Sequence, residues 1–535
     1  MKKILTVLAI VFGLVLASCT PSVVTVPIDC EEWETNIEGV CIDEIEQNID
    51  DFYPGEGVVY QIFVRSFADS DGDGIGDFIG IKENLNYFTE LGVDTLWLMP
   101  IHPSPTYHGY DVLDYYDVNP EYGTMADFDA LVAAADEAGI DIILDFLINH
   151  TSTSHEWFTG WLAGDSQYED YYRSISSSDP RYDLDSSSWH SIGDGQYYYG
   201  YFHEMADLNW SNPAVQEQMI DAALFWLDKG VDGFRLDAVK HLEYYGEVSV
   251  GTQSITSTLN KLQLFEYRLE EEYPDVYISG EVFSYDFTEL KLFYQSVDSV
   301  LNFTTSGTIL RSLNNRTASS YVADIISQYD QMKNIDPEAI DAPFLYNHDQ
   351  DRLATIVNGD MRKLKLAAEM LLTLEGNPHL YYGEEIGMYG YKSSGPFWDE
   401  TRRLPLKWGN DFTTSWHPDT INGTVASIED QFLDPDSLLN VYKNVMRTRQ
   451  ISPALRYGEV VESEYSNNAL VSYYRVLNHD ENHQYKVLVV HNVSEYEYQL
   501  GEMEGTILYY SNGLRNYEGT VSPSSTLIIE VPYSE

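Results

Sequence analysis

Basic residues are scarce in this sequence. Lysine and arginine total 30 against 86 aspartates and glutamates, which gives a formal net charge of −56 over 535 residues. So acidic a surface repels DNA, RNA and anionic lipid headgroups, and we therefore expect no nucleic-acid partner. The charge has two interpretations: it keeps the protein soluble, or it reflects adaptation to high salt, where screening relieves self-repulsion.

Cysteine is also rare, with three residues in the chain. Two lysines and an apolar run precede the segment Leu16-Ala17-Ser18-Cys19. This order is typical of a secretory signal peptide with a small-residue cleavage site. The ending resembles the lipobox of bacterial lipoproteins, in which the cysteine is lipidated. We predict a signal peptide over 1–18, a lipid anchor on Cys19 and a place on the extracellular face of the cell membrane. Ordinary signal cleavage is the alternative.

Residues 19–52 are acidic and lack a periodic apolar pattern, which indicates a tether between the anchor and the folded part. Cys30 and Cys41 lie in this segment. Export permits a disulfide between them, and two free thiols are the alternative. After the signal peptide, no other stretch is long and apolar enough to cross a bilayer.

From Gly57 onward, short apolar runs alternate with helical patterns, as in parallel β-strands joined by crossover helices. Three helices are expected from apolar spacing near 3.6 residues, over 126–138, 214–229 and 364–374. Eight strands with intervening helices predict a (β/α)8 barrel, an α/β fold, over 53–455. The eight predicted strands are Val58–Phe67, Thr95–Pro100, Ile140–His150, Val231–Val239, Val276–Phe283, Val300–Phe303, Phe344–Asp349 and Leu380–Glu384.

Two further units are expected. Residues 150–211, after the third strand, are rich in Tyr, Ser, Asp and Gly. They far exceed the roughly 2–6 residues of a plain βα loop, so they predict an inserted subdomain. Residues 456–535 show short alternating stretches, which predict a C-terminal antiparallel β domain.

Carboxylates fall at the predicted strand ends, where the chemistry of such barrels takes place. Arg235 and Asp237 are two residues apart and share one face of a strand. A neighbouring cation keeps a carboxylate ionised, as a nucleophile requires, although a structural ion pair is the alternative. Glu281 ends an apolar strand, where desolvation raises its pKa and suits it to general acid catalysis. Asp349, beside His348, is a third acid at a strand end.

These segments, in this order, resemble the α-amylase superfamily, glycoside hydrolase family thirteen, from about Val58 to the C-terminus. The resemblance implies a retaining glycosidase, with Asp237 as nucleophile, Glu281 as general acid and base, and Asp349 as stabiliser of the transition state. It implies an α-glucan substrate bound by Tyr110, His150, Arg235, Lys240, His241 and His348. The matching segments are 145–150, 205–209, 233–241, Glu281, 347–349 and 383–388.

An acidic loop at 69–77 alternates carboxylates with glycines, which suits a hard cation with oxygen ligands. It departs from an EF-hand because its twelfth position is Gly80. The loop resembles the calcium loop found in part of the superfamily, which implies a Ca2+ ion. The implied ligands are the side chains of Asp69, Asp71, Asp73 and Asp77 and the carbonyl of Ile75. A solvated acidic turn is the alternative. For a second calcium, Asn149 and the His241 carbonyl would match two ligands.

Within the superfamily, the segment Tyr107–Asp111 is similar to that of endo-acting amylases. Many exo-acting relatives carry an acid where this chain has Tyr107. The acidic loop and the segment 205–209, with Ala206 in place of the usual proline, instead resemble members that lie between amylases and oligo-1,6-glucosidases, so mixed specificity stays open. We expect a monomeric enzyme that cuts α-1,4 bonds inside starch, glycogen or maltodextrins. An exo-acting α-glucosidase, a transglycosylase and a non-catalytic maltodextrin-binding lipoprotein are the alternatives. A pure binding protein has no need of the three acids Asp237, Glu281 and Asp349 together.

Overall fold

A computed structural model describes residues 34–37, 40–43, 57–184, 186–200, 202–242, 252–394, 398–478, 484–501, 503–513 and 517–532. The chain forms two compact units, Met1–Tyr53 and Pro54–Glu535. In the first unit, β1 (Glu34–Ile37) pairs antiparallel with β2 (Val40–Asp43). The predicted signal peptide, Cys19 with its lipid anchor, and Cys30 fall outside the described residues, whereas Cys41, the other half of the predicted disulfide, lies in β2.

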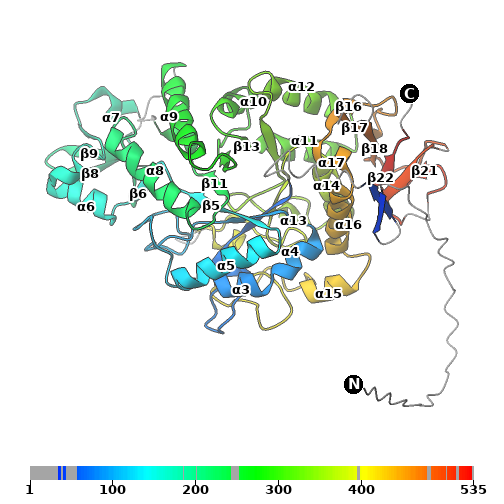
Figure 1. Ribbon diagram of the computed structural model, residues 1–535, viewed down its shortest axis with the longest axis horizontal. Coiled ribbons are helices and arrows are strands. Elements are labelled where there is room, and N and C mark those ends of the chain that lie inside the picture. The colour runs from blue at the N-terminus through cyan, green and yellow to red at the C-terminus, as the bar shows by residue number, and fades with distance from the viewer. Residues whose placement is uncertain are drawn as a thin grey trace, which may run out of the picture. The chain divides into compact units, whose positions relative to one another are not determined.

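The second unit is built on an eight-stranded parallel sheet (Figure 1). Its order is β14-β13-β12-β11-β5-β4-β3-β15, and a parallel bridge between Phe344 and His379 joins the two ends. The predicted (β/α)8 barrel is therefore confirmed. The strands are β3 (Val59–Ile62), β4 (Thr95–Leu98), β5 (Asp141–Phe146), β11 (Gly233–Leu236), β12 (Tyr277–Gly280), β13 (Ser299–Asn302), β14 (Ile340–Pro343) and β15 (His379–Tyr381).

The barrel interior holds a separate apolar layer beneath the polar site. Side chains alternate along a strand, so a residue two or four positions after a residue of this layer also points into the barrel. From Val59, Ile143 and Tyr277, those positions are occupied by polar Gln61, Asp145 and Glu281. Period-two alternation thus stacks the polar groups on an apolar floor. The buried layer consists of Val59, Trp97, Ile143, Tyr277, Leu301, Phe303, Ala342 and Phe344.

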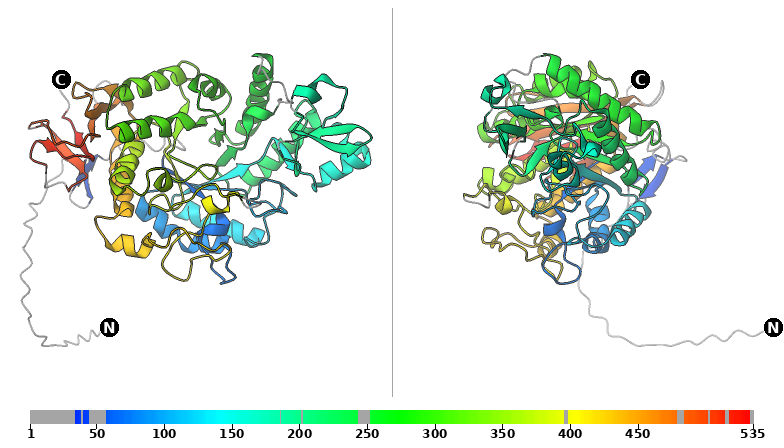
Figure 2. Two further views of the ribbon diagram at one scale, coloured as in Figure 1. Left: turned by 180° about the vertical axis from the view of Figure 1, so that it is seen from behind. Right: turned by 90° about the vertical axis from the view of Figure 1, so that its left-hand side faces the viewer.

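Helices surround the sheet on the outside (Figures 1 and 2). Thr124 closes a capping box with Asp127 at the start of α5, and Asn212 caps α8 ahead of Pro213. In the part of the chain that the structure describes, no helix is long and apolar enough to span a membrane. The longer helices are α5 (Met125–Glu137), α8 (Pro213–Leu227), α9 (Thr252–Glu270), α11 (Phe303–Asn315), α12 (Tyr321–Lys333), α14 (Met361–Leu372) and α16 (Leu438–Gln450).

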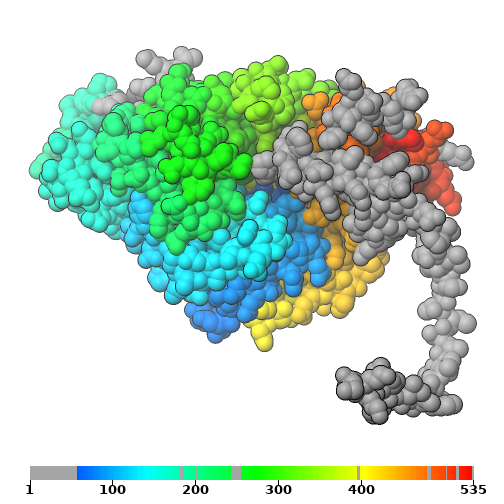
Figure 3. Space-filling model, viewed as in Figure 1, coloured from blue at the N-terminus to red at the C-terminus, as the bar shows by residue number. Residues whose placement is uncertain are grey.

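The insertion after β5 begins and ends in one small ladder, in which β6 (His150–Ser152) pairs antiparallel with β10 (Met205–Asp207). Between them lie two helices and a three-stranded sheet of order β7-β9-β8. The space-filling view places the insertion at the end of this unit that lies opposite the C-terminal strands (Figure 3). The elements are α6 (Glu156–Ala163), β7 (Ser174–Ser176), α7 (Pro180–Leu184), β8 (Trp189–Gly193) and β9 (Gln196–Tyr199).

The C-terminal residues form a five-stranded antiparallel sheet of order β16-β17-β18-β22-β20, as predicted. It is joined to the barrel through Glu369 of α14, whose buried carboxylate accepts hydrogen bonds from Tyr509, Ser511 and Thr526 at 2.6–2.7 Å. The strands are β16 (Glu459–Glu462), β17 (Leu470–Asn478), β18 (Gln484–Asn492), β20 (Thr506–Tyr510) and β22 (Ser525–Glu530), with β19 (Tyr498–Gln499) paired to β21 (Thr520–Val521).

Most predicted strands run past the observed ends, the third, for example, to His150 rather than Phe146, and two need a larger correction. The first ends at Ile62, and the rest of its apolar run forms the short helix α2 (Val64–Phe67). The seventh is Ile340–Pro343 rather than Phe344–Asp349. Its sequence, Ile-Asp-Ala-Pro, does not look like a buried strand because it contains an aspartate. In the structure Asp341 is buried all the same, and it accepts hydrogen bonds from the Tyr294 hydroxyl and the Asn302 amide.

Candidate active site

Arg235 on β11 is the centre of a buried cluster of three carboxylates. Its Nη1 lies 2.6 Å from Oδ1 of Asp145 and 2.9 Å from Oδ1 of Asp237, and its Nη2 lies 2.9 Å from Oε2 of Glu281. Its guanidinium also lies 5.0 Å from the ring centre of Trp97 in the apolar layer below. One fully buried cation therefore holds together three acids from three adjacent strands or strand ends.

Asp349 lies on the loop that follows β14, and two cationic or protonatable groups contact it. Its Oδ2 is 3.1 Å from Nε2 of His348, and Arg403 donates to its Oδ1 over 3.1 Å. Desolvation opposes ionisation, but the charges of His348 and Arg403 prevail and hold the pKa of Asp349 well below its usual range. Asp349 is therefore a carboxylate at all ordinary pH values.

The pKa values of Asp237 and Glu281 move the other way. Burial raises the pKa of Asp237 to about 6 and that of Glu281 to about 7, against the opposing effect of Arg235. We expected desolvation to raise the pKa of Glu281, and the structure agrees. We also expected Arg235 to keep Asp237 ionised; the contact is present, but burial outweighs it. Near neutral pH the pair shares one readily available proton, with Asp237 the stronger acid.

Tyr110 and His348 pack against each other beside these acids. Their rings stack at 5.5 Å with an interplanar angle of 6°, and the Tyr110 hydroxyl donates to Oδ2 of Asp145 over 2.8 Å. Gln61 of β3 lies 2.6 Å from Nδ1 of His348 and fixes the imidazole from below. The Tyr110 hydroxyl also lies 2.6 Å from Nε2 of His348, and the Tyr110 ring is 9% exposed.

The other predicted binding residues lie around this cluster. His150 at the start of β6 is buried and contacts the carbonyl of Tyr110 through Nε2 at 2.8 Å. Lys240 donates to the carbonyl of Phe283 over 2.7 Å, two residues beyond Glu281. Burial lowers the pKa of His241 to about 4, so this imidazole is neutral near pH 7. Tyr110, Lys240, His241 and His348 follow barrel strands, His150 begins the insertion, and Arg235 lies within β11.

Sequence reasoning missed four side chains of this site: Gln61, Trp97, Asp145 and Arg403. The first three sit at inward positions of β3, β4 and β5, and strand alternation could have identified them. Arg403 comes from the long segment after β15, where a pair of arginines in a chain poor in basic residues was the available signal.

Tyr107 lies in an aromatic stack on the same rim. Its ring stacks on Trp416 at 5.5 Å and 22°, and the Arg403 guanidinium lies 6.0 Å from its centre. Trp416 in turn donates from Nε1 to Oγ of Ser66 over 2.7 Å. Position 107 thus holds a tyrosine rather than a carboxylate, and its ring contacts aromatic rings and the Arg403 guanidinium.

The acidic loop at 69–77 brings three of the four predicted carboxylates together. Asp69, Asp71 and Asp77 each offer an oxygen within 4.8 Å of the others. Asp69 is buried and accepts from the amides of Gly72 and Gly74. Asp73 instead accepts from the amide of Ile75 over 2.7 Å and does not join the group. The three grouped oxygens fit a hard cation such as Ca2+, which takes carboxylate and carbonyl oxygens.

The second calcium site, matched by Asn149 and the His241 carbonyl, stays a prediction. Asp207 of β10 is buried with one oxygen unpartnered, burial raises its pKa well above its usual value, and Asn149 donates to it. Among the described residues, no group of three acidic, histidine or cysteine side chains forms around this pair.

Comparison with known proteins places this geometry in context. A family model described as "Alpha amylase, catalytic domain" matches residues 61–458. "Alpha-amylase 3" of Dictyoglomus thermophilum is 38% identical over 487 residues, which cover 89% of this chain and 93% of that protein. "4-alpha-glucanotransferase" of Thermotoga maritima is 36% identical over 395 residues, or 71% of this chain and 84% of that protein. The crystal structure of the alpha-amylase from H.orenii superposes with a TM-score of 0.78 at 34% identity, covering 90% of this chain and 100% of the other.

Proposed function

The chain belongs to the α-amylase family of glycoside hydrolases and transferases, and from this we propose that it cuts α-1,4 bonds inside starch-like glucans with retention of configuration. One observation carries the proposal. Arg235 contacts both Asp237 and Glu281 at 2.9 Å, so one guanidinium holds two carboxyl groups side by side in a water-poor barrel mouth. A pair of close carboxyls with unequal acidity is the machinery of a retaining glycosidase.

The first half of the reaction forms a glycosyl-enzyme. The Asp237 carboxylate attacks the anomeric carbon while the bond from that carbon to the glycosidic oxygen breaks. Glu281 gives its proton to the departing oxygen, which leaves as the hydroxyl of the new chain end. The amide of Ala238 donates to Oε2 of Glu281 over 3.2 Å and helps to orient it.

The second half releases the sugar. The Glu281 carboxylate takes a proton from water, the water oxygen bonds to the anomeric carbon, and the bond to Asp237 breaks. Asp349, held ionised by His348 and Arg403, stabilises the positive charge that develops on the sugar ring in both transition states.

The test uses Asp237→Asn and Glu281→Gln beside the unaltered chain, each incubated with soluble starch. Oligomers of intermediate size should appear early with the unaltered chain, and turnover should fall about 10²–10⁴-fold in the Glu281 variant. Glucose as the first product would assign an exo-acting α-glucosidase. Equal inactivity of all three chains, with tight maltodextrin binding, would assign a binding protein.

Endo action is supported by the surroundings of Tyr107. An exo-acting enzyme needs a group that grips the free end of the chain, whereas Tyr107 stacks on Trp416 and presents no charge. We propose that a glucan chain can extend along Tyr107 and Trp416 beyond the bond that is cut, because no charged group there binds its free end.

Transfer to a second sugar is the other candidate reaction. Two aromatic rings that follow Glu281, Phe283 and Tyr285, are 46% and 63% exposed, and such faces can hold an acceptor sugar in place of water. A product series longer than a maltotetraose substrate would establish transfer, and its loss in Tyr285→Ala would place the acceptor on these rings.

We propose that a Ca2+ ion is held by Asp69, Asp71 and Asp77, with the Ile75 carbonyl as a further ligand. The ion would neutralise the three grouped carboxylates and pin the loop, a structural role that takes no part in bond cleavage. Isothermal titration of the chelated protein with Ca2+ tests binding, with Asp71→Asn as the variant expected to weaken it.

We propose further that the enzyme is exported and anchored through a lipid on Cys19, acting on glucans outside the cell as a monomer. Expression with Cys19→Ser should move the enzyme from the membrane fraction to the medium. An unchanged distribution would favour ordinary signal cleavage.

A further inference from the structure

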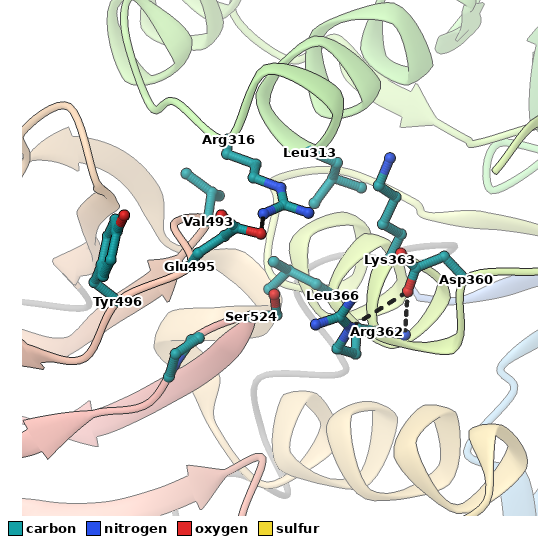
Figure 4. A pocket seen from close by; sticks show the side chains of 11 residues that line it. Leu313, Arg316, Asp360, Arg362, Lys363, Leu366, Val493, Glu495, Tyr496 and Ser524 are labelled. Atoms are coloured by element: carbon teal, nitrogen blue, oxygen red, sulfur yellow. Dashed lines mark hydrogen bonds and ion pairs between the residues drawn. The ribbon is translucent and has the colours of Figure 1, made fainter.

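A pocket of about 400 Å3 lies where α11 and α14 of the barrel meet two turns of the C-terminal sheet (Figure 4). From this pocket we propose a second α-glucan-binding site, whose lining residues all differ from those of the active site. The choice of ligand rests on the proposed function, whereas the pocket itself does not. Its volume falls in the range of roughly 300–1,000 Å3 that small-ligand sites occupy.

The floor of the pocket is apolar. Leu313 of α11, Leu366 of α14 and Val493, just after β18, line it and are each no more than 3% exposed. On the rim lies Tyr496, a tyrosine that is 77% exposed. Tyr496 therefore offers the accessible apolar surface, since the C–H face of a sugar ring packs well on an exposed aromatic ring.

Planar charged groups supply the polar rim. Arg316, at the end of α11, pairs with Glu495 of the facing turn, and the two side chains meet across the pocket (Figure 4). Asp360 pairs with Arg362 at the start of α14, with Nε and Oδ1 3.6 Å apart. Guanidinium groups donate and carboxylates accept, so together they can bind neighbouring hydroxyls of one sugar.

The balance of charge argues against an ionic ligand. Three cationic side chains, Arg316, Arg362 and Lys363, face two anionic ones, Asp360 and Glu495. The pocket lining is therefore close to neutral, although the whole protein has a net charge of −56. A phosphate would meet the two carboxylates and an ammonium would meet the three cations. A neutral polyhydroxyl chain can use both kinds of group.

Residues of both the barrel and the C-terminal sheet line the pocket. Arg316 ends α11 in the left-handed conformation that is common at helix C-termini, with a φ of +52°. Ser524, in the turn before β22, lines the pocket from the C-terminal sheet.

The experiment measures binding to insoluble starch granules by the full chain carrying Asp237→Asn, which prevents turnover. Into this background we place Tyr496→Ala or Arg316→Gly. The matched control is Tyr498→Ala, an exposed tyrosine two residues away on β19 that does not line the pocket. Glycine is the preferred residue at the positive φ of position 316, so misfolding would not explain a loss of binding in that variant.

We expect Tyr496→Ala and Arg316→Gly to raise the Kd for starch at least about fivefold, as truncation of a principal contact does, and Tyr498→Ala to change it less than twofold. With Asp237 restored, kcat/KM on soluble maltoheptaose should stay within about twofold in all three, because that substrate needs only the active site. Unchanged starch binding in both pocket variants would overturn the proposal. Failure of the unaltered chain to hydrolyse maltoheptaose would instead refute the proposed function and leave this binding comparison intact.

Discussion

Arg403 donates from Nη2 to Oδ1 of Asp349 over 3.1 Å, although 54 residues separate them in the chain. The arginine is 4% exposed on its side chain and also lies 5.9 Å from the ring centre of Tyr110. Arg403 thus connects the loop after β15 to the acid that we assign to transition-state stabilisation.

Removing this ion pair should weaken catalysis without removing any group that reacts. A hydrogen bond to a charged partner contributes about 1.5–3 kcal/mol, so Arg403→Ala should lower kcat/KM roughly 10–150-fold. Arg403→Lys should recover part of the loss, since it keeps the charge but not the planar geometry. Arg402→Ala is the control, because its partners are Asp351 and Asp399. An equal loss in both alanine variants would contradict a specific role for Arg403.

Activity should follow a bell-shaped pH profile. Asp237 must be ionised to attack, so kcat/KM should fall as pH drops below about 6, where burial has raised its pKa. Glu281 must be protonated to act as an acid, so kcat/KM should fall as pH rises above about 7. With a nitrophenyl maltoside, whose leaving group needs no proton, Glu281→Gln should lose the alkaline limb. An alkaline limb that survives in this variant would assign that limb to another group.

Chelation should lower the melting temperature if the loop at 69–77 holds Ca2+. A ligand that binds only the folded chain stabilises it by about 2.7 kcal/mol at 100 times its Kd. Excess Ca2+ should restore the melting temperature of the unaltered chain, and Asp71→Asn should respond less to both treatments. Asp73→Asn is the matched variant, because its carboxylate lies outside the group of three. Equal responses of both variants would refute the ligand set.

Two carboxyl groups with raised pKa values, one at the start of β5 and one on α9, predict that the protein loses stability as pH rises. Burial raises the pKa of Asp141 to about 7 and that of Glu266 to about 8, with neighbouring acids adding to the shift. Unfolded carboxyls titrate near pH 4, so between about pH 4 and 8 the folded chain binds more protons and stability falls as pH rises.

Asp141→Asn or Glu266→Gln should therefore raise the melting temperature by ~1–2 °C at pH 8 and flatten its dependence on pH. Added salt should stabilise the unaltered chain more than either variant, since screening relieves the same repulsion. The exposed Glu137→Gln is the control for loss of one negative charge. A gain of the same size in Glu137→Gln would mean that net charge, rather than these buried acids, sets the effect.

The barrel was predictable because its strands are short, largely apolar runs separated by helical patterns, and because its chemistry falls at the strand ends. Local sequence located Asp237, Glu281 and Asp349 as carboxylates at predicted strand ends, and the family resemblance supplied their roles. The seventh strand was not predicted at its true position because it contains Asp341. An aspartate in a sequence usually indicates a surface residue, whereas Asp341 is buried and bound by Tyr294 and Asn302. The partnership of Arg403 with Asp349 depends on how a long loop folds back, and no local pattern encodes that. Likewise, the sequence could not show that the Asp73 carboxylate binds the amide of Ile75 instead of joining the other three acids, because that depends on the backbone conformation of the loop.

Glu369 has a consequence for how this molecule can be cut or recombined. Its carboxylate is buried, and the three hydroxyls that satisfy it all belong to the C-terminal sheet. A foreign sheet that lacks those hydroxyls would bury the Glu369 carboxylate without hydrogen-bond donors, which costs stability. Domain exchange within the family should therefore succeed only when the donor sheet brings hydroxyls to those three positions or when residue 369 is made apolar at the same time.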